Sequence, residues 1–243
     1  MSRLHKPKAG FWIRLCVVIL YPLDAVLFRI RWHNLDRVTP PAEGGVMIAL
    51  NHLSHVDTIV MARFVWQSGR VPRFMIKAGM FTKPILRQIM TGAKQIPVYR
   101  GTQDAAQSLS AAVQALADGE AIVIYPEGTT TKDPDNWPMV AKTGIARLAL
   151  LSPDTPIIPV GQWGAQKRHG LSLERFFKRR TAQASVGNPV DLSRFRGAEP
   201  TAETLREITD TIMTAVRDEV AMLREEPAPT RFFEPPHKYV DRA

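Results

Sequence analysis

The amino-acid sequence predicts an α/β protein in which a mixed sheet is flanked by helices. Short apolar runs of strand length alternate with helix-length segments along most of the 243 residues. Glycines close several of these helix-length segments, as Gly69, Gly92 and Gly119 do. An apolar fraction of 45% is enough for a hydrophobic core and argues against disorder. These observations predict one main folded domain of ordinary size.

The expected elements follow one another from residue 46 onward. Apolar runs predict strands at 46–50, 71–76, 96–99, 122–125, 157–160 and 183–186. Helical spacing predicts helices at 54–67, 85–90, from 104 to just before Gly119, at 144–151 and at 202–223. The tail that follows, 225–243, is rich in proline and charge, and we expect it to be extended or mobile.

The first 35 residues differ from the rest, because a basic start leads into an apolar stretch. Trp12, Tyr21 and Trp32 with nearby arginines are typical of a bilayer interface. We interpret 1–35 as two short helices hinged at Pro22 and lying in the membrane surface. A helix packed on the protein's own core and a hairpin dipping into the bilayer are the alternatives.

This interpretation divides the chain into an interfacial segment 1–35, an α/β domain 36–224 and a tail 225–243. No run of eighteen apolar residues occurs, so the sequence predicts no membrane-spanning helix. The net charge of +9 predicts attraction to polyanions such as an anionic bilayer or phosphorylated ligands. Cys16 is the only cysteine, which excludes disulfides within the chain and thiol-rich zinc sites.

A histidine and an aspartate lie where the apolar run 46–50 ends. On one continuous helix His52 and Asp57 would lie about 140° apart, so they can meet only if His52 sits in the turn and Asp57 in the first helical turn. An aspartate so placed would fix the imidazole tautomer while the imidazole takes a proton. The alternative is that Asp57 only caps a helix opened by Ser54 and that His52 is an ordinary turn residue.

A second strand, 122–125, ends in a similar cluster of polar residues. Pro126, Glu127, Gly128 and Thr129 follow it directly. Glycine permits close approach of the backbone to a ligand, and the amides that follow could bind an anion. A tight turn without a ligand is the alternative.

Together the two segments resemble the glycerolipid acyltransferase family, the 1-acylglycerol-3-phosphate acyltransferases and their relatives. Residues 51–57 match the family's motif Asn-His-x-x-x-x-Asp, and 125–130 match its motif Phe-Pro-Glu-Gly-Thr-Arg. Its other two motifs, a glycine-to-arginine segment and a Val-Pro-Val segment, are similar to 92–101 and 157–160. All four occur in the family's order.

The resemblance implies transfer of a fatty acyl group from acyl-CoA or acyl-carrier protein to 1-acylglycerol 3-phosphate, giving phosphatidic acid for phospholipid synthesis. It implies a peripheral or monotopic enzyme at the cytoplasmic face of the cell membrane, with no cofactor and no metal. The implied catalytic residues are His52 and Asp57. The implied substrate-binding residues are Glu127, Gly128, Thr129, Arg100 and Lys77.

One position departs from the family pattern. Thr130 stands where the family usually has an arginine that is thought to hold the acceptor's phosphate. Arg100 and Lys77 remain as phosphate ligands, and Lys132 could reach back. Another lysophospholipid or a glycolipid is therefore an alternative acceptor.

Two rival functions stay open at this stage. A thioesterase would use the same base to activate water. A non-enzymatic basic module would bind anionic membranes or nucleic acid, although no nucleic-acid fold signature occurs and we expect no nucleic-acid partner. The basic clusters 166–170 and 175–180 suit anionic headgroups, the phosphates of coenzyme A, an acidic carrier protein, or simply solvent.

Overall fold

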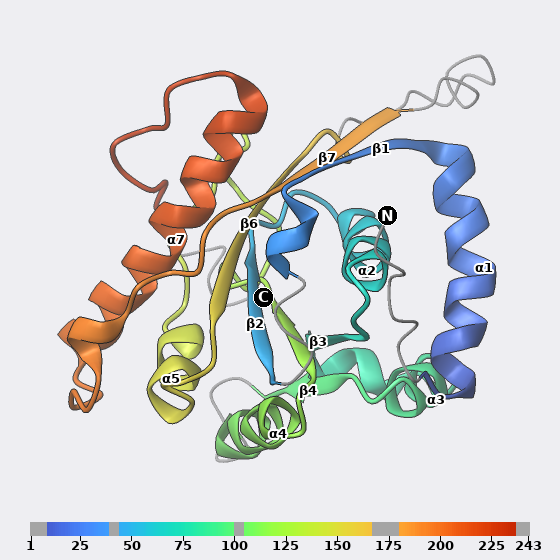
Figure 1. Cartoon of the computed structure of the whole chain (residues 1–243), viewed down its shortest axis with the longest axis horizontal. Helices are drawn as coiled ribbons and strands as arrows, with labels where there is room; N and C mark the ends of the chain where they lie inside the picture. The colour runs from blue at the N-terminus through green and yellow to red at the C-terminus, as the bar shows by residue number, and fades with distance from the viewer. Residues whose placement is uncertain (1–8, 39–43, 100–104, 167–179, 237–243) are drawn as a thin grey trace.

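A mixed seven-stranded sheet forms the centre of the described part of the chain (Figure 1). The computed structural model describes residues 9–38, 44–99, 105–166 and 180–236. The strands are β1 Phe28–His33, β2 Val46–Leu50, β3 Pro72–Lys77, β4 Ile96–Val98, β5 Ala121–Ile124, β6 Ile157–Trp163 and β7 Arg180–Val186. Their spatial order is β1-β7-β6-β2-β5-β3-β4, and neighbours are parallel except for the antiparallel pair β6–β7. The predicted mixed α/β sheet is confirmed.

Helices cover both faces of this sheet (Figure 1). The α-helices are α1 Phe11–Leu27, α2 Asp57–Gln67, α3 Pro84–Gly92, α4 Ala105–Ala117, α5 Gly144–Leu151 and α7 Ala202–Arg224. The 3₁₀ turns in the described part of the chain are η1 Leu35–Val38, η2 Ala78–Thr82 and η3 Ser193–Phe195. Helices α4, α5 and α7 share a core with one face, whereas α2 and η1 pack on the other. Helix α1 lies outside, against α2 and α3.

Strand β2 shows why the central strands read as unbroken apolar runs. Met47 and Ala49 belong to the core under α4, α5 and α7, whereas Ile48 and Leu50 belong to the core under α2. All of them are fully buried, because helices cover a parallel sheet on both sides. The polar segment that follows β2 therefore begins at the carboxyl end of a central strand. Ligands of such sheets bind at the carboxyl ends of the parallel strands.

The predicted two-helix reading of the N-terminal segment is wrong. Helix α1 continues through Pro22, and residues 28–33 form strand β1 beside β7. The side chains of β1 alternate between the protein interior and solvent: Phe28 is buried and Ile30 is half-buried, whereas Arg29 and Arg31 are exposed. Pro22 removes one backbone donor, and the packing of α1 against α2 and α3 offsets that loss.

Gly92 has a packing role at the contact between α1 and α3. A Cβ at Gly92 would lie 2.0 Å from Cδ1 of Trp12, so only glycine lets the indole of α1 lie against the end of α3. Among the described residues, no helix is both long and apolar enough to cross a bilayer.

The C-terminal tail leaves α7 and returns toward the sheet. Glu225 ends the helix in the left-handed conformation. Farther on, the carbonyl of Phe233 accepts a hydrogen bond of 3.0 Å from the amide of Val140, and Phe233 bridges Met139. The described part of the tail is thus an extended segment that is attached to the loop after β5.

Candidate active site

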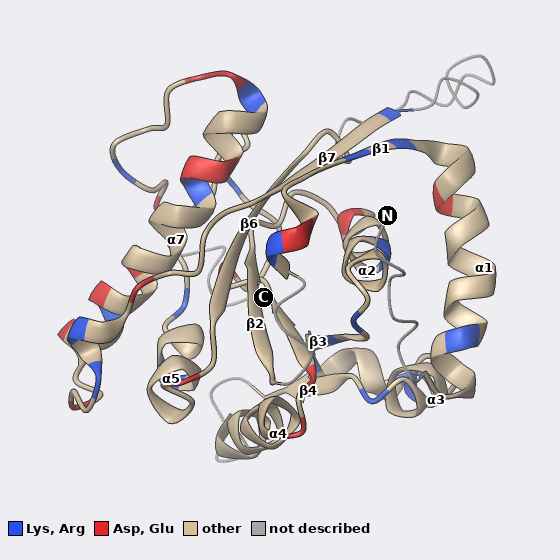
Figure 2. Cartoon of the chain, in the orientation of Figure 1, with Lys and Arg blue, Asp and Glu red and all other residues tan. Residues whose placement is uncertain are grey.

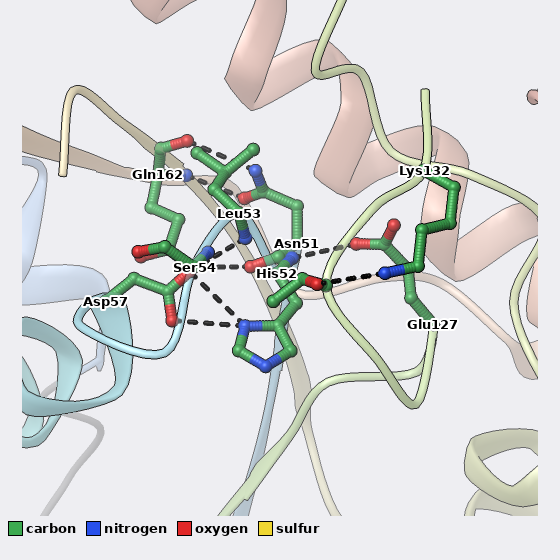
Figure 3. A network of polar contacts seen from close by, with 9 residues as sticks. Asn51, His52, Leu53, Ser54, Asp57, Glu127, Lys132 and Gln162 are labelled. Atoms are coloured by element: carbon green, nitrogen blue, oxygen red, sulfur yellow. Dashed lines mark hydrogen bonds and ion pairs between the residues drawn. The ribbon is translucent and has the colours of Figure 1, made fainter. Parts of the chain in front are cut away.

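His52 and Asp57 meet in the arrangement that the sequence predicts. His52 lies in the turn after β2, and Asp57 is the first residue of α2. Nδ1 of His52 lies 3.1 Å from Oδ1 of Asp57 and 3.3 Å from Oδ2 (Figure 3). The aspartate side chain is 0% exposed and the histidine side chain 12% exposed. Only the imidazole of this pair is therefore open to a substrate.

The carboxylate of Asp57 also organises the turn in front of α2. Its Oδ2 accepts hydrogen bonds from the amides of Leu53, at 2.7 Å, and Ser54, at 2.8 Å. These two bonds delay the start of the helix to Asp57, three residues after the predicted start at Ser54. An imidazole that donates from Nδ1 to this carboxylate has its lone pair on Nε2, which points away from Asp57 (Figure 3).

The backbone of His52 is held by the segment that follows β5. Its amide donates to Oε1 of Glu127 at 2.8 Å, and its carbonyl accepts from the amide of Thr131 at 2.7 Å. Side chain and main chain of His52 are thus fixed by different elements, which limits the positions that the ring can take.

Glu127 is a buried bridge within the protein. Glu127 is 1% exposed. Its second carboxylate oxygen, Oε2, accepts a hydrogen bond of 3.0 Å from the amide of Met139. Burial raises the pKa of Glu127 to about 8, although the amides of Met139 and His52 lower it. Both carboxylate oxygens thus contact backbone, which makes Glu127 a support for the His52 turn. Its predicted contact with substrate stays a prediction.

This buried acid makes the stability of the protein depend on pH. Between the ordinary pKa of 4.5 and about 8, the folded protein holds a proton on Glu127 that the unfolded chain has released. The free energy of unfolding therefore falls as pH rises through that window. Glu127→Gln removes the ionisable group. Between pH 5 and pH 8 the melting temperature of the variant should therefore fall by at least about 3 °C less than that of the parent, which corresponds to about 1 kcal/mol of unfolding free energy.

Asp24 offers the matched control for that measurement. Burial raises its pKa to about 6, and Arg63 opposes the shift. Asp24→Asn should therefore alter the melting temperature's pH dependence below about pH 6 and leave the range from 6 to 8 unchanged. Equal slopes for the Glu127→Gln variant and the parent across the whole range would contradict the assignment.

Tyr125 is a neighbour of His52 that the sequence analysis did not single out. Its ring stacks on the imidazole of His52, with centroids 4.2 Å apart and planes inclined by 25°. Burial raises the pKa of its phenol well above 10, and the nearby Asp57 carboxylate adds to the shift, so the phenol stays neutral. The sequence signal was the tyrosine's place directly before the Pro-Glu-Gly turn.

Asn51 and Gln162 form a second buried connection that the sequence did not reveal. The Asn51 side chain accepts from the amide of Gln162 at 2.8 Å and donates to its carbonyl at 3.1 Å. Nε2 of Gln162 donates to the carbonyl of Asn51 at 2.5 Å. These bonds tie the end of β2 to β6, and the turn that carries His52 begins at this joint.

The other predicted binding residues lie around this cluster. Gly128, with φ of 73°, follows a turn in which its amide donates to the carbonyl of Tyr125 at 2.9 Å, and Thr129 comes next. Lys77 is exposed at the end of β3, and among the described residues no hydrogen bond connects it to His52, Asp57 or Glu127. Arg100 lies outside the described residues.

The loop after Gly128 contains the position that departs from the family pattern. Thr130 accepts a hydrogen bond of 3.4 Å from Nζ of the exposed Lys132. Within the described part of the chain, no group of three or more histidine, cysteine or acidic side chains is placed to hold a metal.

The fold and this site define the chain's class. A model of the acyltransferase family matches residues 29–163, which include β2 through β6, all but the first residue of β1, and the whole His52–Asp57–Glu127 cluster. The chain belongs to this acyltransferase family.

Individual relatives agree with that placement. The chain is 31% identical over 148 residues to a protein of Drosophila melanogaster named tafazzin, a match that covers 57% of this chain and 38% of the fly protein. It is 24% identical over 181 residues to the 1-acyl-sn-glycerol-3-phosphate acyltransferase of Bacillus subtilis, covering 73% of this chain and 82% of that protein.

A solved structure shares the fold. It is the 1-acyl-sn-glycerophosphate acyltransferase PlsC of Thermotoga maritima, with a TM-score of 0.62 and 18% identity. The match covers 89% of this chain and 81% of the other. At this identity the likeness concerns the fold alone.

Proposed function

We propose that this protein transfers a fatty acyl group from a thioester, acyl-CoA or acyl-carrier protein, to the free hydroxyl of 1-acylglycerol 3-phosphate. The product is phosphatidic acid, a precursor in phospholipid synthesis. The observation that carries the proposal is the imidazole of His52, oriented by a buried Asp57 carboxylate 3.1 Å away. The name of the Bacillus subtilis relative supports 1-acylglycerol 3-phosphate as the acceptor.

The geometry suits a general base. Nε2 of His52 takes the proton of the acceptor hydroxyl as its oxygen attacks the thioester carbonyl, and Asp57 stabilises the imidazolium. A tetrahedral intermediate forms and then collapses, breaking the carbon–sulfur bond. The imidazolium returns the proton to the departing sulfur, so the products are one ester and one thiol. The acceptor hydroxyl is the nucleophile, and no covalent enzyme intermediate is required.

Thiol release by the purified protein tests the proposal. Long-chain acyl-CoA and acyl-carrier protein are each supplied with and without 1-acylglycerol 3-phosphate, and the lipid products are separated. Acceptor-dependent thiol release with matching phosphatidic acid is the expected result. Free fatty acid without new ester would instead identify a thioesterase, and the absence of any release from a folded protein would overturn the proposal.

We also propose that α1 rests in the membrane interface. Phe11, Val18 and Val26 are 70%, 69% and 60% exposed on one side of the helix, and Ile19 beside them is 58% exposed. Arg14 on the same helix and Arg29 and Arg31 on β1 are also exposed. Figure 2 marks the basic residues of both elements in blue. Apolar side chains beside arginines are typical of a helix that lies in the headgroup region.

Charges placed on this face should weaken membrane binding. The double substitution Val18→Glu with Ile19→Glu is expected to reduce co-sedimentation with anionic phospholipid vesicles at least about tenfold, because two apolar side chains can no longer enter the bilayer. Leu151→Glu, which alters an apolar side chain 57% exposed on α5, is the control. Equal binding of both variants and the parent would contradict the proposed orientation.

A further inference from the structure

A cavity lies at the carboxyl end of β5, on the side of the sheet that carries α4 and α5. It has a volume of about 390 Å³ and is lined by the ends of β4 and β5, the start of α4, and the start of α5. Volumes of about 300–1,000 Å³ are typical of small-molecule sites. Tyr125 and Gly128 form part of its wall, and Tyr125 stacks on His52. Tyr125 thus contacts both the cavity and the ring of His52, and His52 itself is not among the described lining residues.

Two cations face this cavity. Lys142 and Arg147 both line it, both are exposed, and no aspartate or glutamate is among its described lining residues. Lys142 is fixed close to the site, because its amide donates to the carbonyl of Pro126 at 2.9 Å. Arg147 lies in the first turn of α5, where the positive end of the helix dipole adds to the same field. A cavity with this charge suits an anion.

The other candidate cations are placed differently. Lys77 and Lys132 are exposed and do not line this cavity. Met75 of β3 and Val98 of β4, which lie close to Lys77, do line it. Lys132 instead donates to Thr130, the residue that stands at the family's arginine position. Within the described residues, Lys142 and Arg147 are therefore the basic side chains that share a cavity with Tyr125 and Gly128.

We propose that Lys142 and Arg147 bind the phosphate of a substrate and supply the charge that Thr130 does not. This inference rests on the proposed acyl transfer and names the residues that select its substrate. The phosphate is a monoester of the acceptor lipid or a phosphate of coenzyme A, because both present the same chemistry to a lysine and an arginine. Bound to the acceptor, the pair would hold the glycerol headgroup while the free hydroxyl lies near His52.

Kinetics of Lys142→Ala, Arg147→Ala and the double variant test the inference. Each single variant is expected to raise KM about tenfold for the substrate whose phosphate occupies the cavity, since each removes a charge-assisted hydrogen bond. Arg196→Ala is the matched control, because it removes an exposed arginine that does not line this cavity.

The results separate the possible phosphates. A raised KM for the lipid acceptor with an unchanged KM for acyl-CoA places the acceptor phosphate in the cavity. A raised KM for acyl-CoA, together with an unchanged KM for acyl-carrier protein and for the lipid acceptor, places a coenzyme A phosphate there. Unchanged KM values for both substrates in an active double variant would overturn the inference and leave the proposed function standing. Lack of acyl transfer by the parent protein would instead overturn the proposed function.

Discussion

Replacement of His52 by alanine is expected to lower kcat for acyl transfer by about 10²–10⁴ or more, the usual range for loss of a general base. The hydroxyl of the acceptor would then attack without a group to take its proton. The backbone bonds of residue 52 to Glu127 and Thr131 do not depend on the side chain, so the variant should remain folded. Initial rates of thiol release, together with the melting temperature, measure both expectations.

His55→Ala is the matched control for this variant. The two imidazoles are close, with centroids 6.2 Å apart, but His55 is exposed and no hydrogen bond to Asp57 is among its described contacts. We expect the His55 variant to keep most of the parent's activity. A folded His52→Ala protein with parental kcat would exclude His52 as the base.

Asp57→Asn is expected to lower kcat by a factor on the order of 10²–10⁴ with little loss of structure. The amide oxygen can still accept from the amides of Leu53 and Ser54, which the carboxylate now does at 2.7 and 2.8 Å. The amide nitrogen would then face Nδ1 of His52 and donate to it, which places the ring proton on Nε2. In that tautomer Nε2 cannot accept the proton of the acceptor hydroxyl.

Asp57→Ala separates orientation of the ring from support of the turn. It removes the acceptor for the buried amide of Leu53 and the partly buried amide of Ser54, as well as the partner of His52. The free energy of unfolding of this variant should therefore fall by about 2–4 kcal/mol. Chemical unfolding of the two variants measures this difference. An Asp57→Asn protein with parental kcat would show that the carboxylate serves only the turn, which is the alternative that the sequence alone left open.

The His52–Asp57 contact was predictable because both partners lie within one short segment. A strand, a turn and the first residue of a helix leave few ways for them to meet. The support that Glu127 gives to the His52 turn was harder to predict from the sequence. The second partner of Glu127 is the backbone amide of Met139, and a backbone donor is present at almost every residue and so leaves no sequence signal. The same holds for Gln162, which reaches Asn51 only because β6 lies beside β2.

Most strands and helices were also predictable, since parallel strands covered on both faces are continuously apolar. The bounds of α5 coincide with the prediction, and α7 extends one residue beyond it. Strand β1 was missed because three of its residues are charged or basic and the preceding helix hid its alternation. Lys142 and Arg147 escaped notice because their common cavity is made by packing of α4 and α5 against the sheet.

The junction between α1 and β1 has a mechanical consequence. The helix ends at Leu27 and the strand begins at Phe28, so no linker separates the two elements. With α1 in the bilayer surface, the sheet cannot swivel about a hinge, and its tilt follows from that of the helix. His52 would then work at one set height above the lipid plane. A lysolipid must rise or tilt to that height for its hydroxyl to arrive, so the depth of its glycerol in the bilayer becomes part of substrate selection.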